Sequence, residues 1–205
     1  MSGRRLAVFG AGGMGREAGW LVRAAGDTLV CYLDDRSVPG LDAPVRSLDQ
    51  APSTLDGVVV AIGSPTTRVR VADRVLAAGL PLATLIHPTA VVGPRVTLGP
   101  GALLMPNAVL SVDVDLGRLA QINIGASVSH DGRAGEALTL SPGARVPANV
   151  HFGDRCFVGT GASFVHGLPE APLCVGDDAV VGAGACVIRD VPAGVTVVGV
   201  PARRR

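Results

Sequence analysis

The sequence predicts a protein of two domains, an α/β domain over residues 1–88 and an all-β solenoid over residues 89–205. Two observations predict this organisation. Strand patterns alternate with helix patterns before Pro88, and from Ala90 onward the chain repeats every six residues. Alternating strands and helices are typical of a parallel sheet covered by helices, and a short fixed period with one apolar position is typical of stacked β-coils.

The α/β pattern begins with a buried strand, RLAVFG, and a helix, REAGWLVRAAG, that ends at Gly26. Two further strands follow, TLVCYLDD and GVVVAIG, and then a second helix, TTRVRVADRVLAAG, and a closing strand, LPLATLIHP. Because the strands alternate with helices, we expect a small parallel Rossmann-like sheet with helices on both faces. Pro88 and the first hexad mark the domain boundary.

The hexads run without a gap from AVVGPR at Ala90 to ASFVHG, which ends at Gly167, and they resume as LCVGDD, AVVGAG and ACVIRD. Each hexad is expected to form one flat face, and three hexads to form one triangular coil. The third position carries an apolar side chain that points inward, while Gly, Asn or Asp turns the corners. The five residues 168–172 cannot complete a hexad, so they predict an external loop.

Composition argues against several classes of partner. The formal net charge of +1 creates no field that would favour nucleic acid or an acidic membrane surface. No apolar run is long enough to span a membrane, and the first residues show no signal-peptide pattern. We therefore expect a cytoplasmic protein whose cysteines are free, buried thiols, namely Cys31, Cys156, Cys174 and Cys186.

A glycine-rich segment, GAGGMG, joins the first strand to its helix, with glycines at positions 10, 12 and 15. Glycines permit the tight turn and let backbone N–H groups approach a phosphate at the helix N-terminus. A full dinucleotide site needs two such halves, and residues 1–88 supply one, so the segment favours a mononucleotide or nucleotide-sugar over NAD. A tight turn without any ligand is the alternative.

Polar residues follow the next two strands at the same edge of the predicted sheet. Asp34 and Asp35 end the second strand, where they are positioned to meet a ribose or a base, and Gly63 follows the third strand. Arg68 opens the second helix, either as a partner of a phosphate or as an ordinary solvated residue.

Two solenoid histidines, His130 and His166, hold the fifth position of their hexads and lie two coil steps apart in one column, with Ala148 between them. At about 4.8 Å for each step, their backbones are roughly 10 Å apart, too far to share a metal within one chain. A γ-class carbonic anhydrase would need a closely spaced histidine pair, which the sequence lacks. We therefore expect no metal.

Asp131 directly follows His130, and an imidazole beside a carboxylate is the pairing that a general base needs. On a flat strand the two side chains would point to opposite faces, so the pair forms only if the sixth position turns the corner. A lone surface histidine beside a corner aspartate is the alternative.

The order of motifs along the chain resembles that of the bacterial sugar acetyltransferases, which include sialic acid O-acetyltransferases and UDP-4-amino-sugar N-acetyltransferases. The resemblance covers essentially the whole chain. Its most specific part is a GxGxxG domain joined to the N-x-G-x-x-V-x-H-D pattern of INIGASVSHD. The other matching motifs are LDD, AIG, HPTAVVGP, SPGA, VGDDAVVGAGACVIRDVPAG and VGVPARRR.

The resemblance implies a first domain that binds a nucleotide-sugar and a left-handed parallel β-helix that binds acetyl-CoA as co-substrate. It also implies a homotrimer, with acceptor and CoA meeting between neighbouring subunits. His130 matches the family's catalytic histidine, and Asp131 matches its acidic neighbour. The implied substrate contacts are Gly12, Gly13, Met14, Asp34, Asp35, Gly63 and Asn123, and the implied acetyl-CoA contacts are Thr139, Thr160 and Ala183.

Two residues depart from the family pattern. Met14 stands where the N-acetyltransferases commonly have a histidine, and Thr139 replaces a histidine near the acetyl group. We expect N-acetylation of a UDP-linked amino sugar, with His130 as general base and a backbone N–H or Thr139 holding the oxyanion. The alternatives are O-acetylation, as in the sialic acid enzymes, and a catalytically reduced nucleotide-sugar-binding scaffold. A serine acetyltransferase is disfavoured because a free amino acid needs no nucleotide site.

Overall fold

The computed structural model describes residues 3–205 and divides into two compact units, one ending at Pro88 and one beginning at Thr89. The division falls where the sequence pattern changes from alternating strands and helices to hexads.

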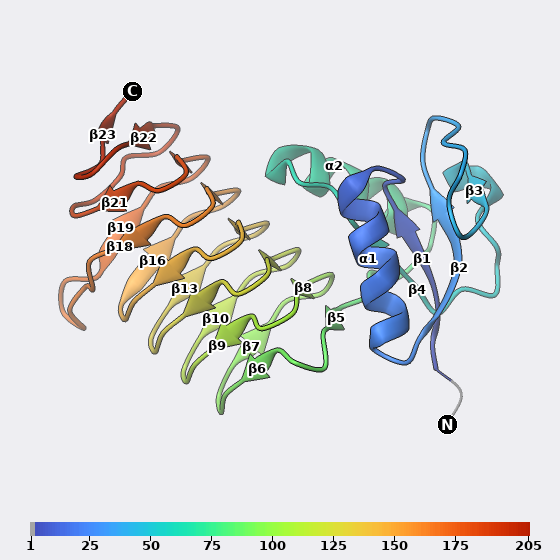
Figure 1. Ribbon diagram of the computed structural model, residues 1–205, viewed down its shortest axis with the longest axis horizontal. Coiled ribbons are helices and arrows are strands. Elements are labelled where there is room, and N and C mark those ends of the chain that lie inside the picture. The colour runs from blue at the N-terminus through green and yellow to red at the C-terminus, as the bar shows by residue number, and fades with distance from the viewer. Residues whose placement is uncertain (1–2) are drawn as a thin grey trace. The chain divides into compact units, whose positions relative to one another are not determined.

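The first unit contains a four-stranded parallel sheet in the order β3-β2-β1-β4. Helix α1 packs against β1 and β2, and α2 packs against β4 (Figure 1). The elements are β1 (Arg5–Phe9), α1 (Gly13–Ala24), β2 (Thr28–Leu33), β3 (Val45–Arg46), a 3₁₀ turn (Leu48–Gln50), β4 (Gly57–Val60), α2 (Pro65–Ala77) and β5 (Leu85–Ile86).

The sequence signals for α2 are visible in its first turn. Ser64 caps the helix by accepting a hydrogen bond from Thr67 N at 3.4 Å, and Pro65 occupies the first turn, where its missing N–H costs nothing.

One prediction for this unit needs correction, and one strand was missed. The expected closing strand is reduced to the two-residue β5, which is not among the four strands of this sheet, and Leu82 makes an isolated bridge to Val58; β3 was not predicted. Two-residue strands are too short to leave an alternating apolar pattern.

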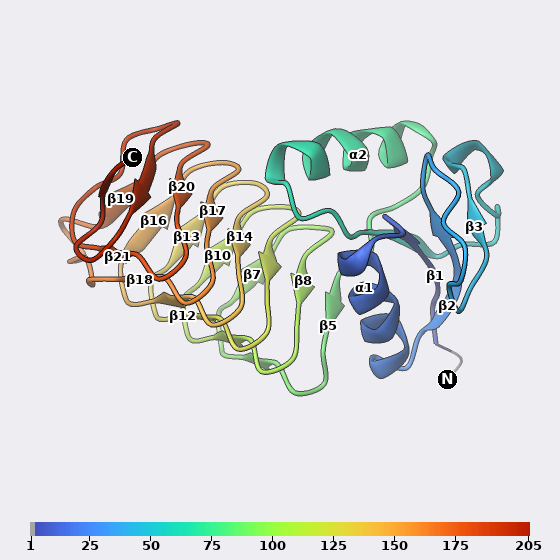
Figure 2. The same cartoon turned by 45° about the horizontal axis from the view of Figure 1, so that its top comes forward.

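The second unit is a parallel β-solenoid whose coils each contribute one strand to each of three sheets (Figures 1 and 2). The first sheet holds β6 (Val91–Val92), β9 (Val109–Leu110), β12 (Ser127–Val128), β15 (Arg145–Val146), β18 (Ser163–Phe164) and β21 (Cys186–Val187). The second holds β7 (Thr97–Leu98), β10 (Asp115–Leu116), β13 (Arg133–Ala134), β16 (Val150–Phe152) and β19 (Leu173–Val175).

The third sheet runs through β8 (Leu103–Leu104), β11 (Gln121–Ile122), β14 (Thr139–Leu140), β17 (Phe157–Val158), β20 (Val180–Val181) and β22 (Thr196–Val198), followed by antiparallel β23 (Arg203–Arg204). Ser127 pairs with Arg145, one coil of three hexads further along the chain. The observed strand register therefore confirms the predicted coil length of three hexads.

Three edges join the sheets, and we name them by their contents. The histidine edge holds residues 94–95, 112–113, 130–131, 148–149 and 166–167. The ladder edge holds residues 100–101, 118–119, 136–137, 154–155 and 177–178. The glycine edge holds residues 106–107, 124–125, 142–143, 160–161 and 183–184.

The sixth hexad position turns each corner in the left-handed backbone region. The residues with positive φ include the predicted Gly, Asn and Asp, but also Arg95, Leu119, Ala137 and Arg155. A left-handed conformation costs a residue with a Cβ roughly 1–2 kcal/mol. Stacking offsets this cost, because the corner amides donate to the coil before them, as Leu119 N does to Pro100 O at 2.9 Å.

The third-position side chains fill the solenoid as predicted, from Leu104 to Val187. Phe152 and Phe164 meet edge to face inside it, with ring centroids 5.5 Å apart. Leu98 and Ala134 are partly buried against this core, and Val92 stays 40% exposed, since β6 ends its sheet and has one neighbouring strand. Of α1 and α2, the helices within residues 3–205, neither combines the length and apolar character needed to cross a bilayer.

The five residues 168–172 form an exposed turn between β18 and β19, in which Leu168 and Ala171 exchange backbone hydrogen bonds at 2.9 and 3.0 Å. The turn lies at the histidine edge, after Gly167, and not beside Thr160 or Ala183. It lengthens one coil without disturbing the stack, because His151 still pairs with Cys174.

Candidate active site

His130 and Asp131 form a hydrogen-bonded pair at the histidine edge. His130 Nδ1 lies 2.8 Å from Asp131 Oδ2, and both side chains are about half exposed. Neighbours in sequence can pair here because Asp131 has a φ of 58°, which turns its side chain out of the alternating strand pattern. With Nδ1 donating to the carboxylate, Nε2 is left able to accept a proton.

Backbone hydrogen bonds stack the histidine edge coil upon coil. Asp131 N donates to Val112 O, Asn149 N to His130 O, and Gly167 N to Ala148 O. His166 therefore lies two coil steps from His130. Across residues 3–205, no three His, Cys, Asp or Glu side chains gather closely enough to hold a metal ion.

Asp113, the carboxylate one coil before this pair, already forms an ion pair with an arginine. Asp113 accepts a bidentate hydrogen bond from Arg95, with Nη2 to Oδ2 at 2.7 Å. The guanidinium lowers the pKa of the Asp113 carboxyl. Asp131 is thus the carboxylate that serves His130.

Thr139 and Asn123, which were predicted to contact ligands, lie on other parts of the solenoid than His130. Thr139 lies on β14, in the sheet that faces the histidine edge across the coil, and is 3% exposed. Asn123 leads into the glycine edge, and its Nδ2 donates to Leu140 O at 2.9 Å. The fold therefore does not bring either side chain to His130 within one chain.

Thr160 and Ala183 are successive steps of the glycine edge. Gly184 N donates to Thr160 O at 2.8 Å, which stacks the two coils directly. These two predicted acetyl-CoA contacts thus lie together, on a different edge from His130.

The glycines of the loop after β1 have different structural duties. Gly10 has a φ of 108°, and a Cβ on Gly15 would lie 1.8 Å from Gly10 O, so these two make the close strand-to-helix turn. Gly12 caps α1, and a Cβ there would meet nothing within 4 Å. Gly13 and Met14 begin the helix, so open space lies at its N-terminus.

Asp34 holds the glycine loop in place. Its Oδ2 accepts Ala11 N at 2.9 Å, and its Oδ1 accepts Arg36 N at 3.0 Å. The carboxylate expected to meet a ribose or base is therefore engaged by backbone amides.

Asp35 is tied to α2 by a bidentate ion pair with Arg74, at 2.7 and 2.8 Å, and this partner lowers the pKa of Asp35. Arg74 also lies over the Phe9 ring, 5.5 Å from its centroid. A cavity of about 220 Å³ opens beside Asp34 and Asp35. Sequence reasoning missed its far wall, Arg46, Ser47 and Gln50, because β3 left no pattern to predict it.

Arg68 is fully buried, which rules out the second of the two alternatives, an ordinary solvated residue. Its Nη1 donates to Ile62 O at 2.8 Å and to Gly63 O at 3.3 Å, and burial lowers its pKa to about 9. Arg68 thereby braces the segment that carries Gly63.

The cysteines are free, as expected, but only two are buried. Cys31 and Cys156 lie in the core, and burial raises the pKa of both thiols, that of Cys156 to about 12. Cys174 is exposed and Cys186 partly exposed, since both hold the second hexad position, whose side chains face outward.

Comparison with known proteins assigns the family. Residues 5–75 match the family model described as the PglD N-terminal domain. The chain is 34% identical over 207 residues to GDP-perosamine N-acetyltransferase of Escherichia coli O157:H7, covering 96% of this chain and 94% of that protein. The chain belongs to the bacterial sugar N-acetyltransferase family.

Solved structures of the sugar N-acetyltransferases agree with this assignment. PerB from Caulobacter crescentus, in complex with CoA and GDP-perosamine, matches with a TM-score of 0.87 and 34% identity over 98% of this chain and 96% of that chain. The acetyltransferase domain of PglB from Neisseria gonorrhoeae, in complex with acetyl coenzyme A, matches with a TM-score of 0.91 and 32% identity over 99% and 100%.

Proposed function

We propose that this protein transfers an acetyl group from acetyl-CoA to the amino group of a nucleotide-linked amino sugar. The observation that carries the proposal is the 2.8 Å His130–Asp131 pair, found in a chain that matches sugar N-acetyltransferases over almost its full length. The solenoid is then the left-handed β-helix of hexapeptide repeats typical of that family.

His130 acts as the general base. As the sugar nitrogen attacks the thioester carbonyl, its proton passes to His130 Nε2, and Asp131 stabilises the imidazolium. Collapse of the tetrahedral intermediate forms the amide and breaks the bond to sulfur, and the CoA thiolate takes a proton. No cysteine neighbours His130, so the acetyl group moves directly to the acceptor.

The first unit binds the nucleotide part of the acceptor. The open N-terminus of α1, at Gly12, Gly13 and Met14, offers unpaired backbone N–H groups to the diphosphate. The cavity beside Asp34 and Asp35, whose other wall is Arg46, Ser47 and Gln50, takes the nucleoside. The relatives named for GDP-perosamine favour guanine in place of the uracil that we expected from the sequence.

A complete site needs more than one chain. Thr160 and Ala183, proposed to line the acetyl-CoA groove, lie on the glycine edge, and Thr139 and Asn123 also lie away from His130. A homotrimer places the glycine edge of one subunit against the histidine edge of the next. The free cysteines suit such an enzyme working in the cytoplasm.

The test is acetyl transfer by a His130→Ala variant, followed as CoA release with acetyl-CoA and GDP-perosamine, and with a UDP-linked amino sugar. Loss of the base should lower kcat about 10²–10⁴-fold. His166→Ala is the matched control, because it removes a histidine from the same column two coil steps away and should keep normal turnover. An unchanged kcat for His130→Ala would remove this residue from the chemistry. Wild-type binding of a nucleotide-sugar without binding of CoA would indicate a scaffold.

A further inference from the structure

The cavity beside Asp34 and Asp35 contains a charged side chain that the fold leaves unpaired. The charged residues that line this hollow of about 220 Å³ are Asp34, Asp35, Arg36 and Arg46. Arg46 is exposed and ends β3, and its backbone carbonyl accepts the N–H of Asp34 at 3.0 Å. Among residues 3–205, its guanidinium meets neither a carboxylate nor another hydrogen-bond acceptor. The N–H donors of Arg46 are therefore available to a ligand.

The other charged groups of the cavity are already paired. Asp34 accepts backbone N–H groups of the glycine loop and of Arg36, and the Arg36 guanidinium approaches it at 3.5 Å. Asp35 is bound by Arg74. Because these groups satisfy one another, Arg46 is the charge of this wall that a ligand can use. A forked guanidinium that is free of carboxylates favours a ligand with two acceptors in one plane.

Arg46 lies across the sheet from the glycine loop, with β2 between them. Leu33, at the end of β2, pairs with Arg46 on one side and accepts the N–H of Gly10 at 2.7 Å on the other. The glycine loop, β2 and Arg46 therefore follow one another in the sheet order β1-β2-β3. With neighbouring strands about 4.8 Å apart, the backbone of Arg46 is roughly 10 Å from the loop. That distance leaves room for a ribose between phosphates at the loop and a base at Arg46.

We propose that Arg46 selects the base of the nucleotide-sugar by donating two N–H groups to O6 and N7 of guanine. The inference rests on the proposed function, which places a nucleoside in this cavity. Guanine presents both atoms as acceptors on one edge, so the guanidinium can bind them bidentately. Adenine presents an amino donor beside N7, and uracil has a single carbonyl, O4, on the corresponding edge. Either base therefore leaves one N–H of Arg46 without an acceptor.

The experiment measures calorimetric Kd values of the full-length protein for GDP, for UDP and for 7-deaza-GDP, in which carbon replaces N7. The wild type should bind GDP about tenfold or more tighter than UDP, and about three- to tenfold tighter than 7-deaza-GDP. Arg46→Met keeps an unbranched side chain without donors, so it should bind GDP and 7-deaza-GDP equally weakly, while its affinity for UDP changes little. Arg46→Lys keeps the charge but not the fork, so it should restore only part of the preference. Thermal unfolding checks that both variants are folded.

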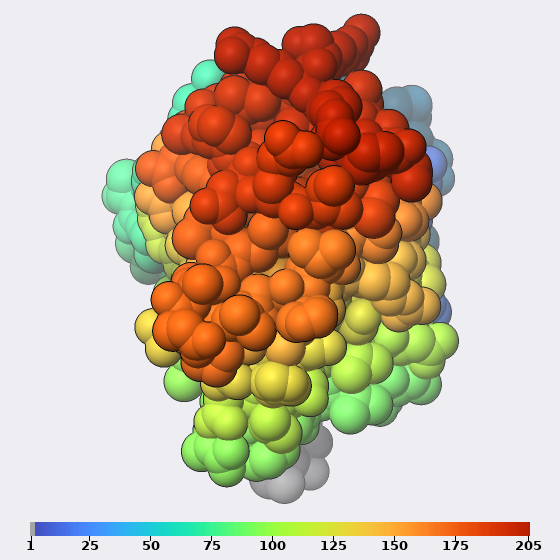
Figure 3. All heavy atoms as spheres, turned by 90° about the vertical axis from the view of Figure 1, so that its left-hand side faces the viewer, coloured from blue at the N-terminus to red at the C-terminus, as the bar shows by residue number. Residues whose placement is uncertain are grey.

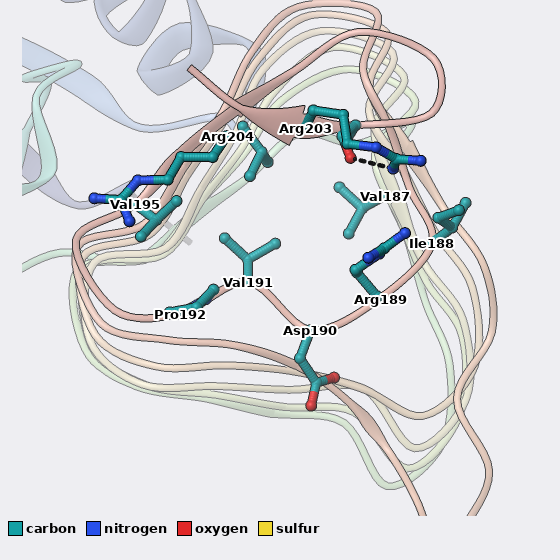
Figure 4. Close-up of a pocket in the computed structure, with 11 residues that line it drawn as sticks. Val187, Ile188, Arg189, Asp190, Val191, Pro192, Val195, Arg203 and Arg204 are labelled. Atoms are coloured by element: carbon teal, nitrogen blue, oxygen red, sulfur yellow. Dashed lines mark hydrogen bonds between the residues drawn. The ribbon is translucent and has the colours of Figure 1, made fainter.

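Arg204→Met is the matched control for the lost charge. Arg204 is also an exposed arginine beside a cavity, a hollow of about 230 Å³ in the last coil of the solenoid (Figure 4). Figure 3 shows that the C-terminal residues form the exposed surface of that end of the solenoid. This variant changes the net charge as Arg46→Met does but leaves the nucleoside cavity intact. Its Kd values for GDP and UDP should therefore equal those of the wild type.

Equal binding of GDP and 7-deaza-GDP by the wild type would overturn the inference, as would an unchanged ratio of the GDP and UDP affinities in Arg46→Met. The same loss in Arg204→Met would also count against it, because net charge would then explain the effect. A wild type that prefers UDP would reject guanine while leaving acetyl transfer intact. Wild-type binding of acetyl-CoA but of no nucleoside diphosphate would instead overturn the proposed function.

Discussion

At the scale of single residues, the corner position decides whether His130 has a partner. Asp131 reaches the imidazole because the sixth hexad position adopts a left-handed backbone, with φ at 58°. Asp131 thus has two structural roles: its backbone turns the corner, and its carboxylate binds His130. Substitutions that remove one role at a time can separate the effects of the two on activity and stability.

Asp131→Asn removes the charge but keeps a side chain that tolerates the left-handed conformation, so it should lower kcat about tenfold with little change in Tm. Asp131→Ala should lower kcat similarly and also cost about 1 kcal/mol of folding free energy, because alanine is strained at this φ. Steady-state kinetics and urea unfolding measure the two effects. Full activity in Asp131→Asn would show that the carboxylate is not needed.

Gly12 and Gly15 should likewise respond differently to an added methyl group. Gly15→Ala places a Cβ against Gly10 O and should destabilise the protein by about 1–3 kcal/mol. Gly12→Ala meets open space, so it should fold normally yet bind the nucleotide-sugar about tenfold more weakly, since the methyl intrudes where phosphate approaches. Thermal unfolding and calorimetry distinguish them, and unchanged binding in Gly12→Ala would argue against a phosphate at this turn.

At the scale of elements, the ladder edge is held by a chain of ion pairs. Arg118 Nε binds Glu136 Oε2 at 2.7 Å, and Arg155 binds Asp178 bidentately at 2.8 Å while approaching Glu136 at 3.4 Å. Each partner belongs to a different coil. The ladder therefore adds an ion pair to the contact between successive coils, from the coil of Arg118 to the coil of Asp178.

The ladder should make stability depend on pH. Arg155 lowers the pKa of Asp178 below its ordinary value of 3.8, so the pair contributes fully above that value and is lost as pH falls through the lower, folded pKa. Arg155→Met should therefore cost about 1 kcal/mol near neutral pH, a difference that shrinks below about pH 4. Urea unfolding from pH 7 to 3 measures it. Arg133→Met, at an exposed arginine of β13, is the control, and a pH-independent difference would contradict the assignment.

At the scale of the whole molecule, a spacing of half a coil along the chain separates His130 from Thr139, although the proposed reaction needs both. Thr139 follows His130 by one and a half hexads, which places it on the opposite side of the triangular coil. Within one solenoid, this spacing keeps the two residues from contacting the same substrate. They can contact it together when a second copy of the chain presents its Thr139 side to the His130 edge of the first.

Subunit complementation tests this sharing. His130→Ala and Ala183→Trp should each be nearly inactive, the first without its base and the second with a blocked groove. Coexpressed in equal amounts with different tags, they should recover activity in about a quarter of the sites, because a trimer then pairs an intact histidine edge with an intact glycine edge. Each doubly tagged trimer then holds about one intact site in three, so its activity measures the recovery, and no recovery would mean that each site belongs to one chain.

Much of the fold could be predicted because hexads and glycine signals are local. The coil length, the inward third position and the His130–Ala148–His166 column all follow from counting residues. The short strand β3, the short extent of β5, the burial of Arg68 and the exposure of Cys174 could not be predicted, since each depends on contacts that no local pattern records.

By itself, the sequence determined the solenoid, the place of an aspartate at the corner position after His130 and the family resemblance, because these depend on residue spacing along the chain. Only the tertiary structure decided that Asp34 braces the glycine loop and that Asp35 pairs with Arg74. The physical reason is that spacing sets a residue's position on a coil, whereas packing sets which partner its side chain meets.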